Sequence, residues 1–368
     1  MNVSDQAKPW LVVLAMTLAS GAVQAQSQEE FEESDRCSSE EPGFCRDGVS
    51  STVTSYDGLR INSRGTAIGQ RQQATDENKP VPSSAHALLL MALGDSGLAG
   101  LNSWLALSRS DFDSEVRGAR YDAQADNLQF GADRMLRQDW LLGIAVGAEN
   151  TETQTRYNGG GQQTDGFTLT GYASHWLDEA CSLNMMIGYA SLSTDQTRID
   201  PDESNPGNPA IGRASYDASR MLADFSGSLL RQSGRWIGSS RLGLLYARES
   251  IDAYTETGLS NPRSVGKSQP ELLQFHVSGE ASRSFRHLDV YGLMGYRYDI
   301  SRDEGQVAGG LPAGEEKTVP DDKDEVELAL GARMFRGNGF AASLEWLETL
   351  TRDDFSNSSI SLLMRMEF

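Results

Sequence analysis

The chain has 368 residues, of which 38% are hydrophobic, with a formal net charge of -20 at pH 7 and a mean hydropathy of -0.44. Because binding to phosphate groups requires clustered Lys and Arg, this acidic balance excludes nucleic acid from the expected partners. The low hydrophobic content argues against a large dry core. Aromatic residues are nevertheless spread through the sequence, which argues against a wholly disordered chain.

Residues 1–25 have the pattern of a secretory signal peptide. Lys8 precedes the apolar run LVVLAMTLASGAV, and Val23 and Ala25 supply the small side chains of a cleavage site. The apolar run is shorter than the roughly 20 residues that a transmembrane helix needs. We therefore predict export, cleavage between Ala25 and Gln26, and a mature chain outside the cytoplasm.

Residues 26–80 are predicted to be a short passenger or a disordered acidic linker. They include the acidic run EEFEESDRCSSEEP and most of the Pro-containing run QRQQATDENKPVPSS, and neither run has apolar periodicity. Cys37 and Cys45 can close a small disulfide loop in an oxidising compartment, and two free thiols are the alternative. Residues 81–100 are predicted to form a linker helix that ends at Gly94.

From residue 101 to the end, about twelve segments of roughly ten residues alternate between apolar and small or polar side chains. Clear examples are WLLGIAVGAEN, SLNMMIGYAS, EVELALGARMF and the terminal SISLLMRMEF. One face of each segment is apolar, whereas the other face is small or charged and is not expected to form a dry core. Five tryptophans near segment ends are candidates for aromatic girdles at a membrane interface: Trp104, Trp140, Trp176, Trp236 and Trp346.

The lengths of the connections distinguish a membrane barrel from a soluble β-sandwich. Long polar stretches alternate with short turns such as LRQD and RQSG, and the long ones lie near 113–126, 151–165, 196–213, 252–270 and 302–324. This segregation is typical of an outer-membrane barrel, whose turns are short on the periplasmic side. Backbone polar groups must all be paired in hydrocarbon, so the spanning strands have to close on themselves. The predicted fold is an all-β, twelve-stranded antiparallel transmembrane barrel over residues 101–368.

The last segment ends on an alternating apolar row, which we predict to face lipid: Ile360, Leu362, Met364, Met366 and Phe368. As the twelfth strand, this segment must pair with the first strand, because an open edge would leave unpaired backbone groups in lipid.

Residues 101–368 also resemble the autotransporter β-domain, the translocator of type V secretion. The resemblance rests on NLQFGADRMLRQDWLLGIAVGAEN, GFTLTGYASHWLDEACSLNMMIGYAS and the terminal LLMRMEF. It implies a barrel inserted by periplasmic chaperones and the outer-membrane assembly machinery, which reads the terminal apolar row ending in Phe368. It also implies outer-membrane lipids and lipopolysaccharide as surroundings, and a linker that passes through the pore to a surface passenger.

Charged residues at inward-facing positions are expected to form ion pairs across the lumen and to contact the chain's own N-terminal segment. The predicted lumen charges are Glu149, Asp224, Arg241, Glu280, Arg297, Glu325, Glu327, Arg333, Glu345, Arg365 and Glu367. The alternative is that most of them are merely solvated, in which case each pair contributes only about 0–1 kcal/mol.

Two motifs are candidates for catalysis. GDSG at 94–97 resembles the surroundings of a serine-hydrolase nucleophile, but no preceding domain supplies His and Asp partners. His276 and Ser278 resemble the pair of outer-membrane phospholipase A, whose site faces lipid, whereas this pair is predicted to face the lumen. We therefore expect no enzymatic activity and no cofactor, and the histidine spacing suggests no metal site.

The leading interpretation is an outer-membrane barrel of a Gram-negative bacterium that anchors, and can translocate, a short N-terminal segment. Only about 75 residues precede the barrel after cleavage, which leaves open that the barrel itself is the product. The alternatives are a structural or pore-forming barrel without a passenger, and a membrane-embedded lipase. The position of residues 26–100, outside the cell, in the lumen or in the periplasm, separates the first two.

Overall fold

The structure is a computed structural model that describes residues 101–114, 121–136, 139–155, 159–178, 180–205, 208–285, 288–303, 323–336, 340–351 and 355–367. The predicted signal peptide, acidic linker, linker helix, GDSG motif and Cys37–Cys45 pair lie outside these residues, as does Phe368. The described part of the chain contains no helix long and apolar enough to cross a membrane.

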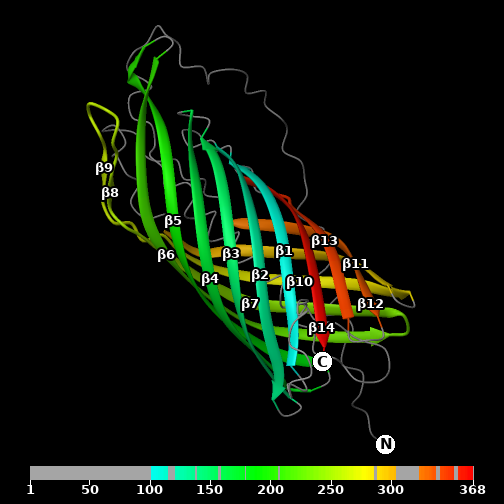
Figure 1. The fold of residues 1–368 in the computed structure, drawn as a ribbon. Helices are drawn as coiled ribbons and strands as arrows, with labels where there is room; N and C mark the ends of the chain where they lie inside the picture. Colours follow the sequence, from blue (N-terminus) through cyan, green and yellow to red (C-terminus); the bar gives the residue numbers. More distant parts are fainter. Residues whose placement is uncertain are drawn as a thin grey trace, which may run out of the picture. The chain divides into compact units, whose positions relative to one another are not determined.

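The described residues form a closed barrel of twelve antiparallel strands (Figure 1). The barrel strands are β1 (Leu101–Ser114), β2 (Tyr121–Leu136), β3 (Trp140–Thr155), β4 (Gly160–Trp176), β5 (Cys181–Asn205), β6 (Asn208–Ser233), β7 (Trp236–Ile251), β10 (Glu271–Phe285), β11 (Leu288–Asp303), β12 (Asp324–Arg336), β13 (Phe340–Thr349) and β14 (Phe355–Glu367). Neighbours in sequence pair with each other, and β14 pairs with β1. The predicted all-β, twelve-stranded antiparallel barrel is therefore confirmed.

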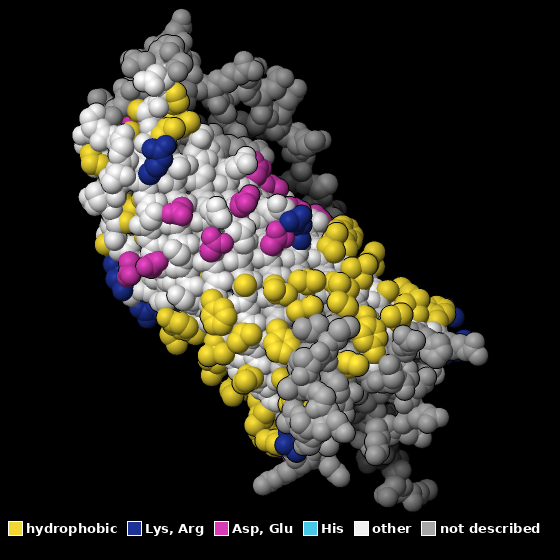
Figure 2. Space-filling model, in the orientation of Figure 1, with side chains coloured by type: hydrophobic (Ala, Val, Ile, Leu, Met, Phe, Trp, Pro, Cys, Tyr) yellow, Lys and Arg dark blue, Asp and Glu magenta, His cyan; other side chains and the backbone are white. Residues whose placement is uncertain are grey.

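Side chains alternate between the outer and inner faces along most of the barrel. In β5, Leu183, Met185 and Ile187 are exposed on the outer face, whereas Asn184 and Met186 are buried on the inner face. Figure 2 shows the exposed hydrophobic side chains gathered in a belt over the lower part of the visible face. This apolar belt includes Leu142, Ile144, Phe167, Leu169, Ile187, Phe225, Leu242, Leu244, Val290, Met294, Leu330, Leu344 and Ile360.

The barrel wall continues beyond the apolar belt on the side of the long connections. β5 and β6 have 25 and 26 residues, although a tilted strand needs only about 9–11 residues to span a membrane. The stretches near 151–165 and 196–213, predicted as loops, are therefore largely strand. Their outer positions, such as Gln154 and Thr197, are polar and exposed. Where the outer face contacts solvent rather than lipid, the outward side chains are no longer apolar, although the strands remain hydrogen-bonded to each other.

The inner face is less polar than predicted. One buried cluster draws apolar side chains from eight of the strands, β1, β3 to β7, β10 and β14, and its members are Trp104, Leu141, Ala145, Tyr172, Met186, Leu222, Leu245, Ala247, Leu272 and Leu363. Trp104, predicted for an interfacial girdle, is only 2% exposed and belongs to this cluster. Trp140, Trp236 and Trp346 are exposed. Because both faces of β1 carry apolar residues, the sequence alone did not indicate which face Trp104 occupies.

β14 closes the barrel against β1 in continuous register, from Asn102 opposite Glu367 to Ser114 opposite Phe355. Leu362 and Met364 lie opposite Leu107 and Leu105, so the outward apolar rows of the two strands meet side by side. Ile360 is exposed, and Leu362, Met364 and Met366 are half-buried.

Candidate functional site: the charged interior

The inner face holds nearly all of the buried charges that the structure describes, and most of the predicted lumen charges lie among them. Glu149, Asp224, Glu325, Glu327, Arg333, Glu345 and Arg365 are buried, and Arg241, Glu280 and Arg297 are half-buried. The side chain of Glu367 lies outside the described residues. Buried charges are stable only when they are paired and hydrogen-bonded, so the partners define the site.

The first group joins two neighbouring strands, β6 and β7, to a third strand that is not their neighbour, β3. Arg220 of β6 donates from Nη1 to Oε1 of Glu149 at 2.9 Å and from Nε to Oε2 of Glu249 on β7, also at 2.9 Å. Glu149 belongs to β3, so the Glu149–Arg220 pair spans the two intervening strands, β4 and β5. Gly166 of β4 makes this possible, since a Cβ there would come within 2.5 Å of Glu149 Cγ. Arg220 and Glu249 were not among the predicted lumen charges.

The second group involves His276, one of the two residues of the alternative lipase pair. His276 Nε2 of β10 lies 2.9 Å from Asp224 Oδ2 of β6, and Asp224 also pairs with Arg241 of β7. Arg241 Nε donates to Ser226 Oγ at 2.9 Å. His276 therefore has its partners on the inner face, whereas a site acting on membrane lipid would have to open outward.

The third group runs across β10 to β13. Arg333 of β12 pairs with both carboxylate oxygens of Glu280 on β10, with Nη1 to Oε1 at 2.8 Å. Its guanidinium carbon lies 4.0 Å from the ring centroid of Tyr291 on β11, a cation–π geometry. The Tyr291 hydroxyl donates to Oε2 of Glu345 on β13 at 2.9 Å. Beside this group, Arg297 Nε lies 3.0 Å from Glu327 Oε2.

The fourth group lies at the end of the barrel where β1 begins. Arg365 of β14 contacts Asp133 of β2 at 3.1 Å, and the hydroxyl of Tyr172 on β4 donates to the same carboxylate at 3.0 Å. Trp104 Nε1 of β1 donates to the Tyr172 hydroxyl at 2.6 Å. The carboxylate of Asp133 thus connects four strands, β14, β1, β2 and β4, across the closure between β1 and β14. A role for Asp133 was not predicted from the sequence.

A further ion pair holds the connection between β7 and β10. This connection contains a separate two-stranded sheet, β8 (Tyr254–Thr255) and β9 (Ser264–Val265), drawn beside β6 in Figure 1. Glu256 accepts from Arg198 of β5 at 3.0 and 2.7 Å, with both side chains buried. Tyr254 stacks on Tyr216 of β6 at 4.4 Å between ring centroids. The stretch at 252–270, predicted as a long loop, is therefore anchored to the wall.

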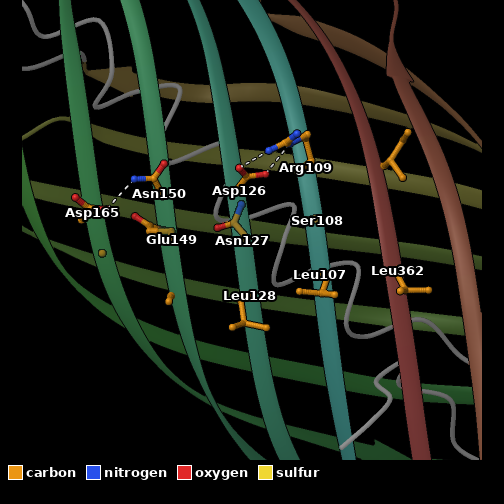
Figure 3. A pocket seen from close by; sticks show the side chains of 13 residues that line it. Leu107, Ser108, Arg109, Asp126, Asn127, Leu128, Glu149, Asn150, Asp165 and Leu362 are labelled. Carbon is orange, nitrogen blue, oxygen red and sulfur yellow. Dashed lines mark hydrogen bonds and ion pairs between the residues drawn. The ribbon is translucent and has the colours of Figure 1, made fainter.

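A hollow of about 710 Å³ on the outer face marks the edge of the apolar belt (Figure 3). Leu107, Leu128 and Leu362 line its lower side. On its upper side, Arg109 forms an exposed pair with Asp126 at 2.7 Å. The change from leucines to charges within one hollow places the boundary of the belt at this level of β1 and β2.

Nothing in the described ranges suggests a metal centre, because no three or more His, Cys, Asp or Glu side chains are grouped to hold an ion. The free thiol of Cys181 is half-buried at the start of β5. The interior groups are consequently networks of ion pairs and hydrogen bonds that connect strands across the barrel.

Comparison with known proteins gives a consistent result. The model of the autotransporter beta-domain family matches residues 104–346. The translocator domain of the autotransporter NalP from Neisseria meningitidis is similar in structure, with a TM-score of 0.63 and 15% identity over 73% of this chain and 89% of that one. The beta domain of the Bordetella autotransporter BrkA has a TM-score of 0.57 and 16% identity over 73% and 100%. No curated protein sequence matches this chain significantly.

Proposed function

Because the chain belongs to the autotransporter beta-domain family, we propose that its outer-membrane barrel anchors the N-terminal segment and carries that segment to the cell surface. The barrel has the features that an outer-membrane location requires. Its strands form a closed barrel, so each strand is hydrogen-bonded to a neighbour on both sides. Its outer face carries an apolar belt, and its buried charges are paired.

One observation carries the proposal beyond anchoring. β1 begins at Leu101 opposite Arg134, close to the turn between β2 and β3, so the N-terminal segment joins the barrel at the end that bears the short turns. Short turns face the periplasm in outer-membrane barrels. A segment attached at this end must pass through the interior to reach the cell surface.

The interior chemistry is compatible with such a passage. Arg220 and Arg333 are neutralised by carboxylates of the wall itself, so these cations are not available to hold a passing chain. At these two positions the wall presents neutralised charges rather than free cations. This property supports transient movement of a polypeptide rather than tight capture of an anionic ligand.

The proposal extends to export and assembly. The signal peptide would be cleaved between Ala25 and Gln26, and periplasmic chaperones and the outer-membrane assembly machinery of a Gram-negative cell would insert the barrel among lipid and lipopolysaccharide. The row Ile360, Leu362, Met364, Met366 and Phe368 would serve as the signal for that machinery. Its support is the regular outward alternation of the described part of β14.

Protease treatment of intact cells tests translocation. An epitope tag placed after Gln26 should be removed by external protease, whereas the same tag in the turn between Ser233 and Trp236 should be protected. A tag after Gln26 that stays protected while the barrel assembles would contradict translocation, and would support the alternative of a barrel without a secreted passenger.

A further inference from the structure

Three exposed arginines gather at the end of the barrel that bears the short turns. Arg231 lies near the end of β6, Arg235 in the turn that follows, and Arg283 near the end of β10. Arg283 lies opposite Trp236 of β7, and Arg231 lies opposite Gly238 of the same strand. The arginines of β6 and β10 therefore flank β7 at the lower edge of the apolar belt.

These three arginines have no carboxylate partner among the described residues. Their side chains form no ion pair and no hydrogen bond within those ranges, although the chain has a formal net charge of -20. At the opposite edge of the belt, by contrast, the exposed Arg109 pairs with Asp126 at 2.7 Å. Asp178, on the short turn between β4 and β5, instead accepts from two backbone N–H groups of its own turn, each at 2.7 Å. The lower edge of the belt thus carries cations that are not neutralised.

Two aromatic rings hold one of these cations in place. The guanidinium carbon of Arg283 lies 5.5 Å from the ring centroid of Trp236 and 5.4 Å from that of Phe285. Both distances fall within the roughly 6 Å range of cation–π contacts. The two rings are 55% and 46% exposed, as expected for an aromatic girdle at a membrane surface. The rings position the guanidinium without neutralising its charge.

The wall directly above the Trp236 ring carries small outward side chains. Four positions on the paired strands β7 and β10 share this property, and they are Gly238, Ser240, Gly279 and Ala281. A Cβ added at Gly279 would meet no atom within 4 Å. Hydrocarbon chains can therefore lie close to the strands here, between the leucines higher in the belt and the cations at its edge.

A lipid with an anionic phosphate headgroup matches this arrangement. Guanidinium groups bind phosphate through charge-assisted hydrogen bonds, and their fork geometry suits its oxygens. The Cα atoms of Arg231 and Arg283 are about 12 Å apart, given strand spacings of about 4.8 Å and a rise of about 3.4 Å per residue. Both long side chains can thus approach one headgroup region from either side of β7. Free phosphate would gain nothing from the exposed rings or the apolar wall, whereas a lipid contacts all three features.

We propose that Arg231, Arg283 and Trp236 form a binding site for an anionic phospholipid, of the phosphatidylglycerol class, in the leaflet that meets the short turns. The inference rests on the proposed membrane location of the barrel. It adds a class of lipid and a place on the wall. Arg235 extends the cationic surface beyond the edge of the belt.

Fluorescence quenching by brominated lipid tests the site in the folded, reconstituted barrel. A variant that retains only Trp236 is placed in phosphatidylcholine vesicles with a low mole fraction of brominated phosphatidylglycerol. Quenching should exceed several-fold that by brominated phosphatidylcholine at the same mole fraction. A variant that retains only Trp346, opposite Ile360 at the other edge of the belt, is the matched control and should show no preference. Equal quenching of Trp236 by the two lipids, or the same preference at both tryptophans, would overturn the proposal.

A second arm tests the contribution of the cations. Replacing Arg231 and Arg283 together by Gln should abolish the preference at Trp236, whereas Arg109→Gln removes a cation that is already paired and should not change it. High salt should weaken the preference without any substitution at the arginines, because the screening length falls from about 8 Å at physiological ionic strength to about 3 Å at 1 M. A preference that survives the double substitution or high salt would contradict recognition by charge.

The outcomes separate the site from the premise on which it rests. Heat-modifiable migration verifies that every variant has folded. Quenching of neither tryptophan by either lipid would reject membrane insertion and the site together, whereas equal quenching by both lipids rejects only the site. Surface exposure of the tag after Gln26 is scored independently, so an exposed tag without lipid preference leaves translocation standing.

Discussion

At the residue scale, several inner-face glycines create the room in which larger side chains reach their partners. A Cβ added at Gly131 would collide with the ring of Trp104. A Cβ added at Gly143 would likewise collide with Tyr172, and one at Gly331 with Tyr291. Two of these aromatic residues take part in the network around Asp133, and the third contacts Arg333. The glycines therefore determine which strands the interior network can connect.

The substitution Gly143→Ala is expected to destabilise the barrel by about 1–3 kcal/mol, since overpacking forces side chains away from good rotamers. The added methyl group would occupy the position of the Tyr172 ring and separate its hydroxyl from Asp133. Unfolding by denaturant in detergent measures the change. Gly171→Ala is the matched control, because nothing lies within 4 Å of its Cβ position. Equal stability of the two variants would refute this role of Gly143.

Arg220→Leu should cost about 3–5 kcal/mol, the usual effect of removing one partner from a buried ionic group. Glu149 and Glu249 would remain buried near each other without their shared cation. The same unfolding measurement applies, and adding Glu149→Gln and Glu249→Gln should recover part of the loss. Arg109→Leu, which removes an exposed pair with Asp126, should change little. If both arginine variants lose the same stability, the network around Arg220 is not a stabilising element.

Period-2 alternation predicts the face of a residue but not its partner. The faces of Glu149 and Asp224 followed from their strands, whereas the link from Glu149 to Arg220 depends on Gly166 two strands away from β6. Arg220 follows the polar run SYDAS in the middle of β6, and Glu249 lies near the end of β7, so the apolar alternation that reveals a face is weak at both positions. Their pairing required the register of β6 with β7.

At the element scale, β14 closes the barrel against β1, and the terminal row that ends in Phe368 is the proposed assembly signal. Deleting Phe368 should lower the amount of assembled barrel several-fold while synthesis stays unchanged. Heat-modifiable migration, compared with total protein, measures both quantities. Phe368→Trp keeps a terminal aromatic residue and should assemble normally. Normal assembly of the deletion variant would remove the terminal row from the proposed assembly signal.

The anchored connection between β7 and β10 leads to a separate prediction. Glu256→Gln weakens its buried pair with Arg198 and should increase proteolytic cleavage within residues 257–263 by several-fold. Lys267→Gln removes only an exposed pair with Asp252 and should leave the cleavage rate unchanged. Cleavage that does not respond to Glu256→Gln would mean that the pair does not hold this connection.

Elements were predictable where lipid imposes alternation and less predictable elsewhere. The first part of β3 was predictable from the alternation in WLLGIAVGAEN. Its continuation to Thr155 is polar on both faces and therefore resembles a loop in sequence. The same holds for the upper halves of β5 and β6. The β8–β9 sheet could not be predicted, because its stability depends on Arg198 and Tyr216, which are distant in sequence.

At the scale of the whole molecule, the apolar belt and the interior are distinct environments, and the tryptophans report on both. Trp140, Trp236 and Trp346 are exposed on the outer face, whereas Trp104 is buried on the inner face. Contact with brominated lipid acyl chains quenches tryptophan fluorescence only at short range. The environments can therefore be separated in reconstituted vesicles with variants that retain one tryptophan each.

Variants retaining only Trp140, Trp236 or Trp346 should be quenched strongly when brominated lipid replaces ordinary lipid, because these rings lie at the edges of the belt. A variant retaining only Trp104 should be quenched several-fold less, since the wall separates its ring from lipid and its Nε1 is bonded to Tyr172. Heat-modifiable migration must first show that each variant has folded. Equal quenching at all four positions would contradict a closed barrel with Trp104 inside. Quenching at none of them would contradict insertion of the belt into the membrane.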